Sequence, residues 1–262
     1  MGFFDRFKKD GKIVGITTPA LLILAVKGGT GKTMITREII MSLMEEVRLA
    51  ALDADVDSPN LAEVLGVKGR WMKLTKDRKF IPVEYNGNVK MFSTSLYHPS
   101  AARGWTKAGQ QNQLILRDAA MYTEWGDIDL FVIDMPAGSS DEFQAVKQWF
   151  RNILGVVVVT QPNTLSDLDR AFNITSRFCL PILGVIENMV EVECDKCGHP
   201  TTLFQEHGAV QKMCEETGVD YLGHIGWVRK LQKSPENDKP LMPERYRGVI
   251  NKLTEVIMNH GK

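Results

Sequence analysis

Short apolar runs alternate along the chain with longer stretches in which apolar residues recur every three or four positions. The runs are typical of strands buried on both faces, and the longer stretches of amphipathic helices. The expected strands are 21–26, 48–52, 89–93, 129–134, 155–160, 182–187 and 220–225. The expected helices are 32–46, 61–65, 111–124, 141–150, 164–178, 207–217 and 244–259. This alternation predicts an α/β fold, with a doubly wound, mainly parallel sheet and helices on both faces.

The pattern predicts an N-terminal extension over 1–20 and one domain over 21–262, which includes a cysteine-bearing loop near 190–203. No apolar run reaches the roughly 18 residues of a membrane span. The first ten residues lack the apolar core of a signal peptide. With only four cysteines in 262 residues, the chain suits a reducing compartment, and we expect it in the cytoplasm.

Charge is balanced, with 32 basic and 32 acidic residues, so no overall field favours nucleic acid or an anionic membrane. The run over 67–80 is locally basic. Such runs are usually solvated faces, and a contact with a polyanion is the alternative. Nucleic acid is therefore not expected as a partner.

A glycine-rich turn joins the first strand to the first helix. Its sequence over 27–33 is Lys-Gly-Gly-Thr-Gly-Lys-Thr. Backbone N–H groups of such a turn surround phosphate oxygens, Lys32 would reach the β- and γ-phosphates, and the Thr33 hydroxyl would ligate Mg²⁺. The residues expected to line the phosphates are Gly28, Gly29, Thr30 and Gly31. The alternative is a tight turn with a solvated lysine.

Acidic residues follow two of the expected strands. Asp134 ends an apolar strand, where a carboxylate would hold Mg²⁺ through water. Asp53, Asp55 and Asp57 follow an earlier strand, and three nearby carboxylates are more stable beside a cation. The alternative is an acidic cap for the next helix.

The turn resembles the deviant Walker A motif of the MinD/ParA/Mrp superfamily of dimeric ATPases, although Val26 stands where the general pattern has glycine. The resemblance implies that Lys27 crosses a dimer interface to the partner's nucleotide. It also implies that Asp55 orients or activates the attacking water, with Asp57 as the competitor for metal or water.

Two further positions take roles from the same resemblance. The segment from Asp134 to Gly138 is similar to switch II, which implies that Gly138 offers its N–H to the γ-phosphate. Asn188 follows the strand 182–187, where an asparagine reads the adenine edge in similar proteins. A turn or cap asparagine is the alternative for Asn188.

Cys194 and Cys197 form a Cys-x-x-Cys pair, a spacing that binds zinc or iron–sulfur clusters. One pair supplies two thiolates, whereas a cluster or tetrahedral zinc takes four ligands. Cys179 and Cys214 have no partner at ligand spacing and are expected to be apolar core residues. The simplest way to complete the four ligands is a two-fold axis that brings two copies of the pair together. His199 is an outside candidate for a further ligand.

The sequence Asn-Met, a spacer, Cys-x-x-Cys-Gly and a following helix closely resembles the Mrp/ApbC family of iron–sulfur cluster carrier ATPases over about 20–260. The resemblance implies a homodimeric ATP hydrolase that holds a [4Fe–4S] cluster at its interface and passes it to apo iron–sulfur proteins. Zinc is a plausible replacement for the cluster. The alternatives are a ParA/MinD-type ATPase for chromosome partitioning or cell-division positioning and a nitrogenase-reductase-like electron donor. The cysteine spacing argues against both.

Overall fold

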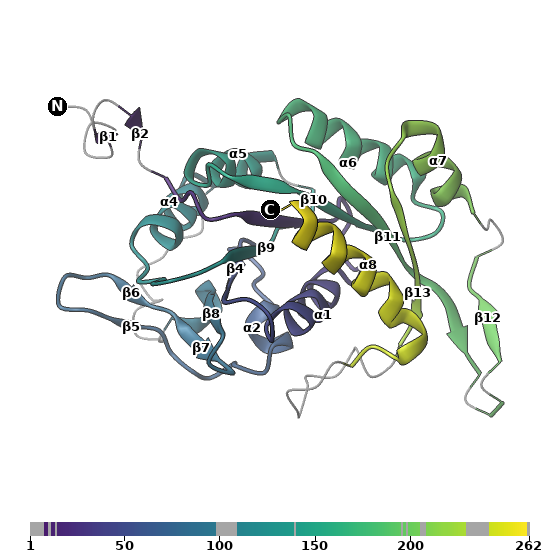
Figure 1. Ribbon diagram of the computed structural model, residues 1–262, viewed down its shortest axis with the longest axis horizontal. Helices are drawn as coiled ribbons and strands as arrows, with labels where there is room; N and C mark the ends of the chain where they lie inside the picture. The colour runs from purple at the N-terminus through teal and green to yellow at the C-terminus, as the bar shows by residue number, and fades with distance from the viewer. Residues whose placement is uncertain are drawn as a thin grey trace.

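The computed structural model describes residues 8–9, 12–13, 15–97, 109–138, 140–194, 196–197, 199–204, 208–228 and 241–260. Most of the first ten residues, and most of the loop expected over 95–110, lie outside these ranges. Figure 1 shows a central sheet with helices on both sides.

The central sheet has nine strands, in the order β12-β11-β10-β3-β9-β4-β8-β7 with β13 paired to β11. The core strands run parallel, whereas β7 and β12 are antiparallel additions. The strands of this sheet are β3 (Ala20–Leu24), β4 (Leu49–Asp53), β7 (Val83–Tyr85), β8 (Val89–Phe92), β9 (Leu130–Asp134), β10 (Ile153–Thr160), β11 (Ile182–Glu193), β12 (Pro200–Thr202) and β13 (Tyr221–Trp227). Two small hairpins lie outside it, β1–β2 (Lys8–Lys9, Lys12–Ile13) and β5–β6 (Lys73–Leu74, Phe80–Ile81).

Helices cover the sheet in two layers. They are α1 (Lys32–Leu43), α2 (Leu61–Val64), η2 (Thr94–Leu96), α4 (Gly109–Met121), α5 (Ser140–Trp149), α6 (Leu165–Arg177), α7 (Ala209–Thr217) and α8 (Glu244–His260). Helices α1 and α8 pack together on one face (Figure 1). The strand order and the right-handed crossover rule place α4 to α7 on the other face.

The strand order reverses beside β3, because the chain moves one way from β3 to β4 and the other way from β9 to β10. In open parallel sheets the crevice at the carboxyl ends of such strands is the usual ligand site. The glycine-rich turn leaves β3 at this point. The predicted doubly wound, mainly parallel fold is therefore confirmed.

Several elements differ from the sequence-based expectations. Helix α1 ends at Leu43 and α4 begins at Gly109, so both boundaries move by two or three residues. The largest difference is β11, which continues to Glu193 because its far end pairs with β12 on one side and with Trp227 on the other. Asn188 therefore lies inside a strand, and the expected loop over 190–203 is mostly a hairpin.

Candidate functional site

The glycine-rich turn takes a conformation that only glycine adopts easily. Gly29 and Gly31 have φ values of 80° and 82°, in the left-handed region. A Cβ atom on Gly31 would also collide with the side-chain amide of Asn188. Gly28 has no protein atom within 4 Å of its would-be Cβ, so the protein itself does not require a glycine there. Gly28 is exposed, and it lines the same cavity as the rest of the turn.

Two amide side chains hold the carbonyl groups of this turn. Asn188 Nδ2 donates to Thr30 O at 2.7 Å, and Gln161 Nε2 donates to Gly29 O at 3.3 Å. In a planar trans peptide the N–H points opposite to the carbonyl, so the next N–H groups point away from these amides. The residues of the turn also line a cavity, and we expect these N–H groups to face it. The turn is therefore oriented to donate hydrogen bonds to an anion.

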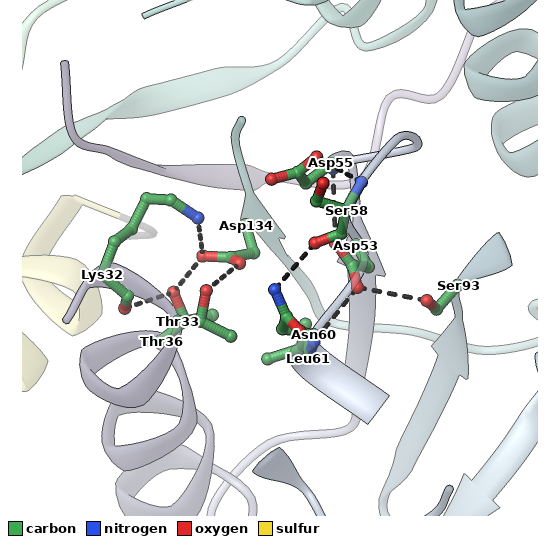
Figure 2. Close-up of polar contacts among 10 residues, drawn as sticks. All are labelled: Lys32, Thr33, Thr36, Asp53, Asp55, Ser58, Asn60, Leu61, Ser93 and Asp134. Carbon is green, nitrogen blue, oxygen red and sulfur yellow. Dashed lines mark hydrogen bonds and ion pairs between the residues drawn. The ribbon is translucent and has the colours of Figure 1, made fainter. Parts of the chain in front are cut away.

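Asp134, at the end of β9, is the centre of a compact cluster with α1 (Figure 2). Lys32 Nζ lies 2.6 Å from Asp134 Oδ1, and the Thr36 hydroxyl donates to the same oxygen at 2.6 Å. The Thr33 hydroxyl donates to Oδ2 at 2.8 Å. Asp134 is 1% exposed, so these three donors, and not bulk water, stabilise its charge. Sequence reasoning missed Thr36, although it lies one helical turn after Thr33 and so shares its face.

The structure places Asp53 next to this cluster but gives it a different role. It pairs with Asp134 in the register of β4 and β9 and is 1% exposed. Burial, and then the charge of Asp134, raise the pKa of the Asp53 carboxyl well above the usual aspartate range. Its oxygen accepts hydrogen bonds from Leu61 N and the Ser93 hydroxyl, both at 3.1 Å (Figure 2). Asp53 therefore ties the start of α2 to the sheet.

The other two aspartates of this segment face different surroundings. Asp55 lines a cavity of about 310 Å³ together with the glycine-rich turn and Asn60. Its carboxylate accepts the N–H of Ser58 at 3.0 Å. Asp57 is exposed and accepts a hydrogen bond from Asn112 Nδ2 at 3.0 Å, toward α4. The geometry thus brings Asp55, and not Asp57, to the cavity lined by the glycine-rich turn, which we call the phosphate cavity for its expected ligand.

Lys27 and Gly138 lie at the border of the cluster. Lys27 is exposed and lines the rim of the cavity, where its ammonium group is accessible to a second molecule. Gly138 has a φ of 70° and donates its N–H to Ala25 O at 3.2 Å. A Cβ on Gly138 would lie 2.8 Å from Val26 O, so the segment approaches the turn closely. The γ-phosphate contact assigned to Gly138 stays a prediction.

The residues present fit a magnesium ion. Mg²⁺ prefers oxygen ligands and is usually held by one or two protein groups together with substrate phosphates. Thr33 and Asp134 offer a hydroxyl and a carboxylate whose oxygens are 2.8 Å apart, and Thr33 lines the phosphate cavity.

Cys194 and Cys197 lie at the exposed tip of the hairpin formed by β11 and β12. Cys194 N donates to His199 O at 3.0 Å, which closes the loop and brings the two cysteines onto one short turn. None of the four cysteines is in a disulfide. Among the described residues, no three His, Cys, Asp or Glu side chains gather into a metal site.

The remaining cysteines are far from this hairpin. Cys179 precedes β11, and a strand of that length separates it from Cys194 by roughly 35 Å. The expectation that Cys179 is a core residue is wrong, because it is exposed at a tight corner with a φ of 51°. Cys214 is fully buried in α7, as expected. Burial raises the pKa of its thiol to about 11, with smaller contributions from nearby glutamates.

One strand connects the two sites. Asn188 holds the glycine-rich turn, and Cys194 follows six positions later, directly after the end of β11. Between them Met189 has a φ of 63°, and the register with β13 shifts between Asn188 and Val192. Glu191 accepts a hydrogen bond from the Tyr246 hydroxyl of α8 at 2.7 Å. The cysteine hairpin is thus attached to the nucleotide side through an irregular segment.

The fold is that of the MinD-like P-loop NTPases. The structure is similar to a nucleotide-binding protein from Archaeoglobus fulgidus in complex with ADP, with 21% identity, a TM-score of 0.67 and coverage of 81% and 83% of the two chains. It is also similar to the septum site-determining protein MinD of Pyrococcus horikoshii complexed with Mg-ADP, with 19% identity, a TM-score of 0.58 and coverage of 92% and 96%.

The chain belongs to the family described as NUBPL iron-transfer P-loop NTPase, within the ParA group, whose model matches residues 17–260. It is 32% identical to an iron–sulfur cluster carrier protein of Pseudomonas fragi over 242 residues, which are 89% of this chain and 82% of that protein. Within the described part of the chain, no helix has both the length and the hydropathy needed to cross a membrane.

Proposed function

We propose that this protein binds and hydrolyses ATP and carries a [4Fe–4S] cluster, held between two copies of the chain, to apo iron–sulfur proteins. The observation that carries the proposal is the exposed Cys194–Cys197 tip on the same strand that contacts the phosphate-binding turn. Family membership supports the carrier function. The need for reduced thiols supports a cytoplasmic location.

In the nucleotide site each residue would have a separate role. The N–H groups of the turn bind the phosphates, and Lys32 leaves Asp134 to contact the β- and γ-phosphates. Thr33 and Asp134 would hold Mg²⁺, which supplies compensating charge to the phosphates. Asp55 orients the attacking water, and Lys27 reaches the nucleotide of the second copy. Asn188 remains the candidate for the adenine edge, in addition to its contact with Thr30.

The cluster half of the proposal requires two copies of the chain. A [4Fe–4S] cluster takes four thiolates, and each hairpin presents two. A two-fold axis past the hairpin tips would bring the four together. Zinc, which accepts four thiolates, would fit the same arrangement.

Nucleotide binding would be coupled to the cluster through β11. Movement of the glycine-rich turn changes the position of Asn188, and the irregular segment after it changes the direction of the hairpin. Such coupling is a shift between two states of the dimer, one holding and one releasing the cluster. A positioning ATPase of the ParA or MinD type shares the fold but gives the thiolate pair no role.

The proposal is tested by cluster transfer. After anaerobic reconstitution with iron and sulfide, the protein is expected to hold a cluster and to pass it to an apo-ferredoxin faster with Mg-ATP than without. Absorbance of the acceptor at the cluster band measures the transfer. A protein that takes up no iron contradicts the carrier function, and transfer at one rate with and without ATP contradicts only the coupling.

Asp55→Ala is expected to retain ATP but to reduce the hydrolysis rate by about 100-fold, because a group that orients or deprotonates water typically contributes that much or more. Asp57→Ala, which changes an exposed carboxylate paired with Asn112, is the matched control and is expected to hydrolyse at nearly the original rate. Phosphate release and nucleotide affinity are measured on both. A loss in Asp57→Ala alone would assign the role to Asp57.

A further inference from the structure

The β5–β6 hairpin forms a small sheet of its own at the end of the molecule opposite the cysteine hairpin (Figure 1). Lys73 pairs with Ile81 and Leu74 with Phe80. Thr75 N donates to Lys79 O at 2.9 Å and closes the turn. A third segment lies beside β6, because Phe80 N donates to Tyr122 O at 2.7 Å. The hairpin includes the second half of the locally basic run at 67–80.

The two faces of this hairpin differ. The Phe80 ring packs against Phe92 and Tyr97, with centroid distances of 5.4 and 5.5 Å, so the face with Phe80 points toward the core. Side chains alternate along a strand, which puts Lys73, Lys79 and Ile81 on the opposite, outward face. Thr123 bridges to Phe80, so its neighbour Tyr122 shares the outward face with Ile81.

Exposed apolar side chains are concentrated at this hairpin. In the described chain six large apolar side chains are exposed, and four of them belong here: Trp71, Leu74, Ile81 and Tyr122. Their exposed fractions are 41%, 57%, 40% and 40%. Leu74 pairs with Phe80 and so lies on the face opposite Ile81, whereas Trp71, two positions before Lys73, and Tyr122 lie on the side of Ile81. Soluble surfaces rarely gather several such residues without a binding role.

Cationic side chains surround these apolar groups. Lys73, Lys76, Arg78 and Lys79 are exposed, and none of the four makes an ion pair within the part of the chain that the structure describes. The two other cations of the run are engaged, since Lys68 pairs with Glu63 at 2.6 Å and Arg70 donates to Glu84 O at 3.2 Å. The acids nearby are Asp77 in the turn and Glu124 beside β6.

We propose that the outward face of the β5–β6 hairpin, with Trp71, Lys73, Lys79, Ile81 and Tyr122, docks on the surface of an anionic lipid bilayer. Indole, phenol and aliphatic groups enter the region between headgroups and acyl chains, and the lysines contact lipid phosphates and carboxylates. The inference stands apart from the proposed carrier function. It places the contact far from the cysteine hairpin, so the cluster would remain accessible on a bound molecule.

The composition of the face favours a bilayer over a protein or a nucleic acid. Cores of protein interfaces are depleted in lysine and enriched in arginine, whereas lysine with tryptophan and aliphatic residues is typical of bilayer-surface segments. A lysine ammonium group is a point charge that can contact any of many anions on a surface. An arginine guanidinium group is a planar fork that suits one carboxylate or phosphate held in a fixed position. The chain as a whole is neutral, so the attraction is local to this hairpin.

Flotation with lipid vesicles tests the proposal on the full chain. Wild-type protein is expected to float at low salt with vesicles that contain about one-third phosphatidylserine, and not with pure phosphatidylcholine. The double variant Lys73→Gln/Lys79→Gln should bind about 30-fold more weakly, because each lysine near an anionic surface contributes about fivefold. The matched control is Lys212→Gln/Lys252→Gln, which removes exposed lysines from α7 and α8 and should bind as the wild type does.

Fluorescence locates the contact. Vesicles with brominated acyl chains are expected to quench part of the tryptophan emission of the wild type, and Trp71→Phe should abolish that quenching while the other four tryptophans remain. Circular dichroism and ATP hydrolysis of all variants verify that the fold is intact.

Three outcomes would overturn the proposal. One is equal binding to neutral and anionic vesicles, and another is undiminished binding by the Lys73/Lys79 variant, which would place the contact elsewhere on the chain. The third is failure to bind vesicles together with tight binding of poly-glutamate or single-stranded oligonucleotide through the same lysines, which would make the partner an acidic macromolecule.

Discussion

Lys32→Ala is expected to weaken ATP binding by about 100-fold and to abolish hydrolysis, because hydrogen bonds to charged groups contribute roughly 1.5–3 kcal/mol each. Lys32 is the buried cation at the base of the phosphate cavity, and in the structure it contacts Asp134 at 2.6 Å. Without it, Asp134 keeps the hydroxyl donors Thr33 and Thr36, so the variant should still fold. Isothermal titration and phosphate release measure the effect, and thermal melting verifies the fold.

The neighbouring lysine provides the contrast. Lys27→Ala removes an exposed side chain at the rim of the cavity, so it should retain ATP in each chain and lose hydrolysis that depends on a second copy. In a mixture with Asp55→Ala, a chain that keeps Lys27 would face a chain that keeps Asp55, and partial activity should return. Nucleotide affinity of Lys32→Ala equal to that of the wild type would show that this turn is not the phosphate site.

Cys194→Ala and Cys197→Ala are each expected to lose the reconstituted cluster completely, together with the dimer contact that it supports. Each substitution leaves a two-copy site with two thiolates, too few to hold four iron atoms. ATP binding should survive, because the glycine-rich turn keeps its contacts with Asn188 and Gln161. Iron analysis, absorbance and size-exclusion chromatography under anaerobic conditions measure the three properties.

The other cysteines are the matched controls. Cys179→Ala removes an exposed thiol at the opposite end of β11, and it should leave the cluster in place. Cys214→Ala tests a buried thiol that remains protonated near neutral pH, because burial and neighbouring glutamates raise its pKa. A bridged cluster predicts about two iron atoms per chain. Four iron atoms on a strictly monomeric chain would contradict bridging.

The glycine-rich turn could be proposed as the phosphate site from sequence because the chemistry it needs is local. Three glycines, a lysine and two threonines are contiguous over 28–33, and the backbone between them fixes their geometry once a buried strand precedes and a helix follows. The same holds for the Cys-x-x-Cys pair, whose spacing alone places two thiols on one turn. Alternating apolar runs likewise determined the parallel sheet, since burial on both faces leaves a continuous apolar signature.

Contacts between distant segments could not be identified in this way. Asn188 and Thr30 are 158 positions apart in the sequence. The side-chain amide of Asn188 reaches the Thr30 carbonyl only because β11 pairs with β10, and β10 pairs with β3. The β5–β6 hairpin was missed because its strands are only two residues long, so their pairing depends on the packing of Phe80 and not on local propensity.

Local geometry follows from neighbouring residues, whereas contacts between distant segments depend on how the whole core packs. The sequence by itself determined the glycine-rich backbone that we propose binds phosphate and the paired thiols that we propose bind metal, because covalent neighbours set those geometries. Only the tertiary structure decided that Asp55 faces the cavity while Asp57 turns to Asn112, and that Cys179 lies a full strand away from Cys194. Those outcomes depend on strand order and helix packing, which single residues influence only as part of the whole core.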